Sequence, residues 1–377
     1  MEERIIYFDY NSTTPIDPRV LEKMMPYLTN QFANASSAHH FGISTKKAVE
    51  DSRKQVAELI GATSNEIVFT SGATEAINIA IKGIAQIYSS KGNHIVTVST
   101  EHKAVLDTCK YLETIGYEVT YLPVKSDGLL DLDLVRNSIR TDTILVSVMH
   151  VNNETGVIQP IKQISDLAHE KGAIFMSDCT QSVGKIPVNV VELGIDILSL
   201  SAHKIYGPKG IGALYLKKGI KKIPSQIHGG GHEQGLRSGT LNVPGIVGLG
   251  KACEIAKEEM IQNEKKIKEL RDSLEKKLLT IKGSKVNGSL DSRVFNVTNI
   301  LFPNLNANIL IEKLKNIAIS NGSACSSAIY SPSHVLTSMG LREDEAYSSI
   351  RFSLGKLNTI DDINDLCKFL NKELKKL

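Results

Sequence analysis

Ser201-Ala202-His203-Lys204 lies between two apolar segments that are typical of buried strands, 195–200 and 211–216. Lys204 therefore follows the end of a predicted strand, beside a hydroxyl and an imidazole. Burial lowers the pKa of a lysine, and the neutral amine can then attack an aldehyde and form a Schiff base. A single lysine is more often an exposed surface residue. The chemical prediction for Lys204 consequently depends on what the neighbouring segments carry.

Two further strand ends carry residues that suit pyridoxal phosphate. Asp178 ends the apolar segment 173–178, and a buried carboxylate needs a cationic partner such as a pyridinium nitrogen. Gly72 lies in a turn that follows segment 66–70 and opens a helix, where free backbone N–H groups suit a phosphate. That turn alone is also compatible with an ordinary helix cap. The three features in this order predict a site for pyridoxal phosphate.

Strand-like segments alternate with helical patterns between residues 66 and 216. This alternation predicts an α/β fold with a mostly parallel seven-stranded sheet and helices on both faces. Ligands of such sheets bind beyond the carboxyl ends of the strands, where the proposed site residues lie. The predicted strands are 66–70, 94–99, 118–122, 143–148, 173–178, 195–200 and 211–216.

The C-terminal part of the sequence predicts a smaller α+β domain. A long helix is expected from about 247 to 281, because apolar residues recur at helical spacing between charges. The sequence predicts a large domain over 16–259 and a small domain formed by 1–15 and 260–377. The further expected elements are strands at 295–302 and 349–354 and helices near 306–316 and 360–376.

Composition excludes several classes of protein. The 44 basic and 41 acidic residues give a net charge of +3, which favours neither nucleic acid nor a membrane surface as a partner. The acidic N-terminus does not resemble a signal peptide, so a cytoplasmic protein is expected. The five cysteines are scattered and lack C-x-x-C spacing, which argues against disulfides and zinc. Glycines separate His228 from His232 and Glu233, so no resident metal is expected there.

The chain resembles a group I cysteine desulfurase, the family of the nitrogen-fixation and iron–sulfur-cluster desulfurases, within fold type I of the pyridoxal phosphate enzymes. The resemblance implies conversion of L-cysteine to L-alanine, with the sulfur taken up as a persulfide by Cys325. Small departures are Ala202, where the family usually has Gly, and Ala35, where Asn34 is usually followed by Pro. The matching motifs are 8–15, 100–105, 150–156, 201–204, 228–233, 237–240, 323–327 and 349–355.

The resemblance also implies catalytic roles. Cys325 lies in a small, polar segment (about 321–332) that suits an exposed thiolate nucleophile. Lys204 would remove the α-proton of the substrate, and Asp178 would keep the cofactor ring protonated. His102 would stack on that ring and take part in proton transfer. Cys325 could also contact an iron–sulfur cluster transiently.

The remaining expected contacts, again by resemblance, concern the phosphate, the ring oxygen and the substrate. Gln181 would hydrogen-bond the phenolate oxygen of the cofactor, and Asn153 would reach that region or the substrate carboxylate. Arg351 would bind this carboxylate with a bidentate fork, with Asn34 also assigned to the substrate. The expected phosphate ligands are Ala73, Thr74, Ser201, His203 and, from a neighbouring subunit, Thr240, which implies a homodimer.

Two alternatives remain open. Another pyridoxal phosphate activity, such as an aminotransferase or a selenocysteine lyase, would not need Cys325. A non-catalytic sulfur carrier or scaffold-binding protein could keep the same fold. The acceptor of the sulfur, whether a cluster scaffold or a thiolation enzyme, is not fixed by the sequence.

Overall fold

The computed structural model describes residues 4–322 and 331–374. Its largest sheet has seven strands in the order β2-β8-β7-β6-β5-β3-β4, and only β8 runs antiparallel to its neighbours. The predicted α/β fold is therefore confirmed, and each strand begins and ends within two residues of its expected bounds. The strands are β2 (Ile67–Thr70), β3 (His94–Val98), β4 (Glu118–Leu122), β5 (Thr143–Ser147), β6 (Ile174–Asp178), β7 (Ile197–Ser201) and β8 (Gly212–Leu216).

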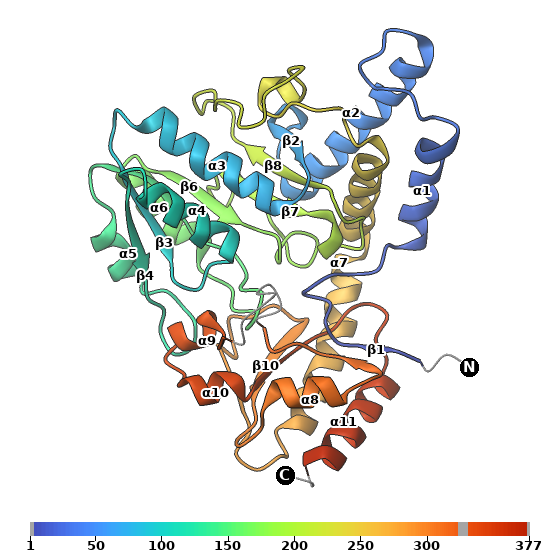
Figure 1. Ribbon diagram of the computed structural model, residues 1–377, viewed down its shortest axis with the longest axis vertical. Helices are drawn as coiled ribbons and strands as arrows, with labels where there is room; N and C mark the ends of the chain where they lie inside the picture. Colours follow the sequence, from blue (N-terminus) through green and yellow to red (C-terminus); the bar gives the residue numbers. More distant parts are fainter. Residues whose placement is uncertain (1–3, 323–330, 375–377) are drawn as a thin grey trace.

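Helices cover both faces of this sheet (Figure 1). Successive side chains of a strand point to opposite faces, so Val68 of β2 packs with α3 and α4, whereas Ile67 and Phe69 pack with the helices of the other face. The first face is covered by α3 (Ala73–Tyr88) and α4 (Lys103–Glu113). The second is covered by α1 (Pro18–Thr29), α2 (His40–Ile60), α5 (Leu132–Ser138), α6 (Ile161–Glu170) and the first half of α7 (Val243–Leu278).

A second hydrophobic core lies around a three-stranded antiparallel sheet in the order β12-β10-β9. Phe8, Phe302 and Phe352 are fully buried in it. The N-terminal strand β1 (Ile6–Tyr7) pairs in parallel with β11 (Ile317–Ala318) beside this core. The other elements here are β9 (Lys285–Val286), β10 (Val297–Leu301), α8 (Ala307–Lys313), α9 (His334–Ser338), α10 (Glu343–Tyr347), β12 (Ser349–Ser353) and α11 (Ile360–Leu374).

The long helix α7 connects the two cores (Figure 1). It starts four residues before the expected position, because the Asn242 side chain accepts a hydrogen bond from the Gly245 N–H and a proline occupies the first turn. Its first half packs on α1 and α2, and Ile267, Leu274 and Leu278 enter the second core. The helix crosses the predicted domain boundary at 259/260 without interruption, and that boundary stays a prediction.

A buried ion pair fixes the edge strand β2, which leads into the expected phosphate turn. Arg53 of α2 donates to both carboxylate oxygens of Glu233, at 2.7 and 2.8 Å, and Glu233 also accepts the Phe69 N–H at 2.7 Å. Both side chains of the pair are buried. Glu233 therefore serves as an internal anchor of the strand.

Arg53→Met should lower the free energy of unfolding by about 3–5 kcal/mol, because it leaves the Glu233 carboxylate buried without its cation. Urea titration measures this change. Lys257→Met is the control, since Lys257 and Glu58 form an exposed pair worth below about 1 kcal/mol. Equal stability losses in the two variants would contradict the anchoring role.

Candidate active site

A cavity of about 640 Å³ opens beyond the carboxyl ends of the parallel strands, a volume that suits a small-molecule ligand. Its walls come from the β2–α3 turn, the end of β6, the β7–β8 connection, the N-terminal segment and β12. Ten residues that the sequence assigned to the site line it together: Ala73, Thr74, His102, Asn153, Asp178, Gln181, Ser201, His203, Lys204 and Arg351.

Lys204 ends a short 3₁₀ turn (Ala202–Lys204) that directly follows β7. Its Nζ donates to the main-chain oxygens of Asn11 and Ser12, both at 2.6 Å. Carbonyl oxygens accept hydrogen bonds from an amine without removing its proton. The N-terminal segment consequently holds the lysine amine at the cavity wall.

Asp178 is the last residue of β6 and is only 4% exposed. Its Oδ1 accepts from the Thr180 N–H at 3.0 Å, the Thr180 hydroxyl at 2.5 Å and the Ser199 hydroxyl at 3.1 Å. Among the described residues, none donates to Oδ2. A buried carboxylate with one oxygen fixed and the other open to the cavity can pair with the protonated nitrogen of a pyridine ring.

The N-terminus of α3 forms one end of the cavity. No side chain caps this helix, so its first N–H groups can receive an anion. Gly212 of β8 permits close packing here, because a Cβ on it would lie 2.7 Å from the Gly72 Cα. His203 lies nearby, with its Nδ1 3.1 Å from the Thr13 hydroxyl. Burial, followed by the charge of Lys204, lowers the pKa of His203 to about 4, so its imidazole is neutral at pH 7.

Arg351 of β12 forms the opposite side of the cavity. Its Nη2 lies 2.6 Å from Asp9 Oδ1 and 2.7 Å from the Ser12 hydroxyl. Its Nη1 donates to the main-chain oxygen of Asn153 at 3.0 Å. A carboxylate ligand would therefore share this guanidinium with Asp9. His102 caps α4, where its Nδ1 accepts the Ala104 N–H at 3.1 Å.

Three assigned residues are not among those that line the cavity. Asn34 is exposed between α1 and α2, where it accepts the Ser36 N–H. Thr240 is exposed as well. Cys325 lies outside the described residues, although Gly322, three positions before it, lines the cavity.

Sequence reasoning missed Lys185 and Glu101. Lys185 donates to the side-chain oxygens of Gln181 and Asn11. Its position four residues after Gln181 was the only feature of the sequence that pointed to this contact. Glu101 is fully buried, accepts the Met149 N–H at 2.5 Å, and has a pKa well above its usual range because of burial. Glu101 lies inside the matching motif 100–105, but the resemblance gave it no role, and Lys185 lies in none of the matching motifs.

Comparison with known proteins assigns the chain to a protein family. The sequence profile of the aminotransferase class-V family matches residues 6–366. "Cysteine desulfurase IscS" of Mannheimia succiniciproducens is 53% identical over 376 residues, covering 99% of this chain and 93% of that protein. A solved "NIFS-LIKE PROTEIN" superposes with a TM-score of 0.93 at 39% identity, covering 99% of this chain and all of the other. A structure titled "SspA in complex with cysteine" has a TM-score of 0.83 at 41% identity, covering 94% and 99% of the two chains.

The fold and the cavity thus define an enzyme of the aminotransferase class-V type. The chain belongs to this family and, within it, to the cysteine desulfurases of the IscS and NifS type. Across residues 4–322 and 331–374, no helix is long and apolar enough to cross a membrane.

His150 lies under the cavity and generates a pH prediction. It is 5% exposed, its main-chain N–H donates to the main-chain oxygen of Asp178, and its Nδ1 has no hydrogen-bond partner among the described residues. Burial lowers its pKa from 6.5 to about 4. Between these values the unfolded chain binds a proton that the folded protein does not, so stability decreases as the pH falls.

Because of this one imidazole, the free energy of unfolding should fall by about 3 kcal/mol as the pH is lowered from 6.5 to 4. Urea unfolding at a series of pH values measures the slope for the wild type and for His150→Phe, which keeps a buried ring but cannot titrate. The variant should show a shallower loss over that range. Identical slopes would mean that His150 is protonated in the folded protein.

Proposed function

We propose that this cysteine desulfurase holds pyridoxal phosphate in the 640 Å³ cavity, converts L-cysteine to L-alanine there, and receives the sulfur on Cys325 as a persulfide. The observation that carries the proposal is the convergence of Lys204, Asp178, His102 and Arg351 on one cavity. An amine, a buried carboxylate, an imidazole and a guanidinium are the groups that this chemistry requires.

The residues present fit the cofactor at each of its ends. The uncapped N-terminus of α3, with Thr74 and Ser201, suits the phosphate, and Asp178 Oδ2 suits the ring nitrogen. Gln181 is held with its Nε2 as a donor, which suits the phenolate oxygen. Once bound, pyridoxal phosphate supplies an electron sink for the carbon from which a proton is removed.

The protein's own groups then bind the substrate and move protons. Lys204 Nζ is the base that takes the proton from the substrate α-carbon and later returns one. Arg351, which Asp9 and Ser12 already orient, binds the substrate carboxylate. His102 is positioned by its N-cap hydrogen bond to serve as a second proton carrier at the cavity wall.

Burial of the other thiols supports Cys325 as the sulfur acceptor. Cys109, Cys179, Cys253 and Cys367 all have raised thiol pKa values because of burial, and a thiol needs to be a thiolate to attack sulfur. Cys325 follows the cavity residue Gly322 by three positions, a separation that the chain can span over about 10 Å.

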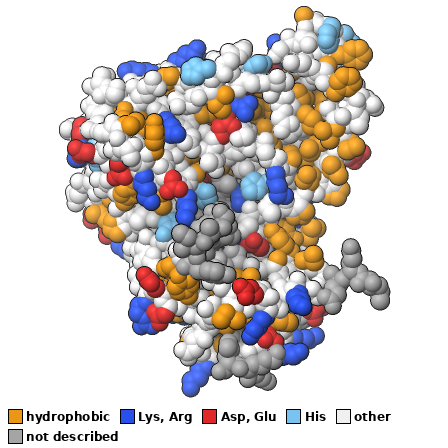
Figure 2. All heavy atoms as spheres, in the orientation of Figure 1, with side chains coloured by type: hydrophobic (Ala, Val, Ile, Leu, Met, Phe, Trp, Pro, Cys, Tyr) orange, Lys and Arg blue, Asp and Glu red, His pale blue; other side chains and the backbone are white. Residues whose placement is uncertain are grey.

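A homodimer is part of this proposal. Thr240 is exposed in the single chain, as expected for a residue that completes the phosphate site of another subunit. Hydrophobic side chains gather on the side where α1 and the start of α2 lie (Figure 2). Such a patch is typical of a protein interface. Its exposed members are Leu21, Met25, Leu28, Phe32, Phe41 and Ile43. A cytoplasmic location and an acceptor protein for the sulfur remain predictions.

Cys325→Ser should bind pyridoxal phosphate and L-cysteine, but its alanine production should fall at least ~100-fold, because a hydroxyl cannot form a persulfide and is a poor nucleophile at pH 7. Alanine assays and intact-protein mass spectrometry measure both effects. The mass increase of one sulfur should occur only in the wild type. Wild-type alanine production in the variant would identify a lyase that releases the sulfur without Cys325.

Asp178→Ala should fold but should bind pyridoxal phosphate weakly and lose at least ~100-fold in activity, since the ring nitrogen would lose its carboxylate. Absorbance titration with the cofactor and alanine assays provide the two measurements. Asp166→Ala is the control, because Asp166 forms an exposed pair with Lys162 on α6 and neither residue lines the cavity. If Asp178→Ala bound the cofactor and produced alanine as well as this control does, Asp178 would have only a structural role.

A further inference from the structure

Lys185 is a buried amine without a carboxylate partner. Its side chain is 9% exposed, and its Nζ donates to Gln181 Oε1 at 2.5 Å and to Asn11 Oδ1 at 3.2 Å. Both acceptors are neutral amide oxygens. Buried lysines are rare unless they are paired with a charge. Burial of this amine therefore costs free energy, and packing alone does not explain why the amine is there.

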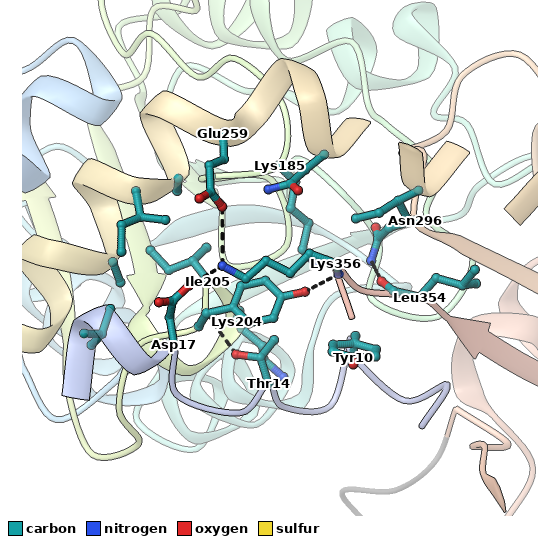
Figure 3. Close-up of a pocket in the computed structure, with 18 of the residues that line it drawn as sticks. Tyr10, Thr14, Asp17, Lys185, Lys204, Ile205, Glu259, Asn296, Leu354 and Lys356 are labelled. Atoms are coloured by element: carbon teal, nitrogen blue, oxygen red, sulfur yellow. Dashed lines mark hydrogen bonds and ion pairs between the residues drawn. The ribbon is translucent and has the colours of Figure 1, made fainter. Parts of the chain in front are cut away.

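The surroundings of Lys185 confirm that no carboxylate reaches it within the described residues. Lys185 and Lys204 both line a second, small cavity of about 50 Å³ behind the active site (Figure 3). The carboxylates of that cavity, Asp17 and Glu259, pair with Lys356 and with Arg19. The charged groups that act on Lys185 are the cations Lys204 and Arg351, and together with burial they lower its pKa to about 7.

The two acceptors connect Lys185 to the active site. Gln181 receives the Lys185 amine on Oε1 and donates its Nε2 to the main-chain oxygen of Asn11 at 2.9 Å. The same Asn11 oxygen accepts from Lys204 Nζ. Lys185 thus bridges the Gln181 amide and the Asn11 side chain, and Asn11 in turn contacts the reactive lysine.

The bridge permits only one orientation of the Gln181 amide. With the amide reversed, its NH₂ group would face the donor Lys185, and its oxygen would face the Asn11 oxygen. A neutral lysine amine could accept from a reversed amide through its lone pair, but the Gln181 oxygen would then still face the Asn11 main-chain oxygen. Gln181 is therefore held with Nε2 available as a donor on the cavity side, in either protonation state of Lys185.

We propose that Lys185 is a positioning residue of the active site, which fixes the Gln181 amide as a hydrogen-bond donor toward the phenolate oxygen of the cofactor and keeps Asn11 in place beside Lys204. This inference rests on the proposed function, because it concerns the same cofactor. Lys185 itself contacts neither the cofactor nor the substrate in this account.

The test measures the pH midpoint of the visible absorption change of the bound cofactor in four proteins: the wild type, Lys185→Met, Gln181→Ala and the double variant. Lys185→Met removes a nearby positive charge and the hold on the Gln181 donor. Both changes favour a proton on the Lys204 nitrogen, so the midpoint should rise by at least ~0.5 pH unit. Gln181→Ala should raise it similarly, and kcat/KM should fall at least ~10-fold in both.

The double variant shows whether Lys185 acts through Gln181 or independently of it. If Lys185 acts through Gln181, the double variant should show no more than about the larger of the two single shifts. Additive shifts, or an unchanged midpoint in Lys185→Met, would overturn the inference. Lys356→Met is the matched control: it removes another lysine of the small cavity (Figure 3), and its midpoint should equal that of the wild type despite some loss of stability.

A second variant covers the case in which Lys185→Met does not fold. Lys185→Arg keeps a donor-only side chain, so its midpoint should remain within ~0.3 pH unit of the wild type. A midpoint displaced as far as in Gln181→Ala would overturn the inference. A wild type without cofactor absorption would overturn the proposed function as well, whereas unshifted variants with normal wild-type absorption would overturn only the role of Lys185.

Discussion

The main-chain oxygen of Asn11 accepts hydrogen bonds from Lys204 and Gln181 at once, and the active site depends on this convergence. Asn11 belongs to the N-terminal segment, whereas its two donors follow strands of the seven-stranded sheet. The Asn11 side chain also accepts from Lys185 and from Asn296 beside the second core. One asparagine therefore joins the two cores at the cavity that we propose as the active site.

The charges around the cavity favour an anionic ligand. Three cations, Lys204, Lys209 and Arg351, line it, together with the carboxylates of Asp178 and Glu75. Glu75 is already paired with Arg237, and Arg351 with Asp9, which leaves Lys204 and Lys209 against Asp178. The half-buried imidazole of His203 and the buried imidazole of His150 are neutral at pH 7 and do not change this balance of charge. A ligand with a phosphate at one end and a carboxylate near the other matches this distribution.

The sequence was sufficient to predict the sheet and most of the site, because parallel strands end at one edge. Asp178 ends β6 and Lys204 follows β7, so the topology alone brings both residues to one cavity. The same reasoning could not find Lys185, since its role comes from hydrogen bonds in a turn and not from a periodic pattern. Asn34 and Thr240 are exposed in the single chain. The role predicted for Thr240 requires a second subunit, whereas the single chain places Asn34 outside the cavity lining.

We expect Lys204, and not the neighbouring buried Lys185, to carry the cofactor. Borohydride reduction of the protein loaded with pyridoxal phosphate, followed by proteolysis and mass spectrometry, distinguishes the two lysines. The reduction joins the cofactor permanently to the amine that holds it. The added mass should lie on the peptide that contains Lys204. The added mass on the Lys185 peptide, or on no lysine of the cavity, would contradict it.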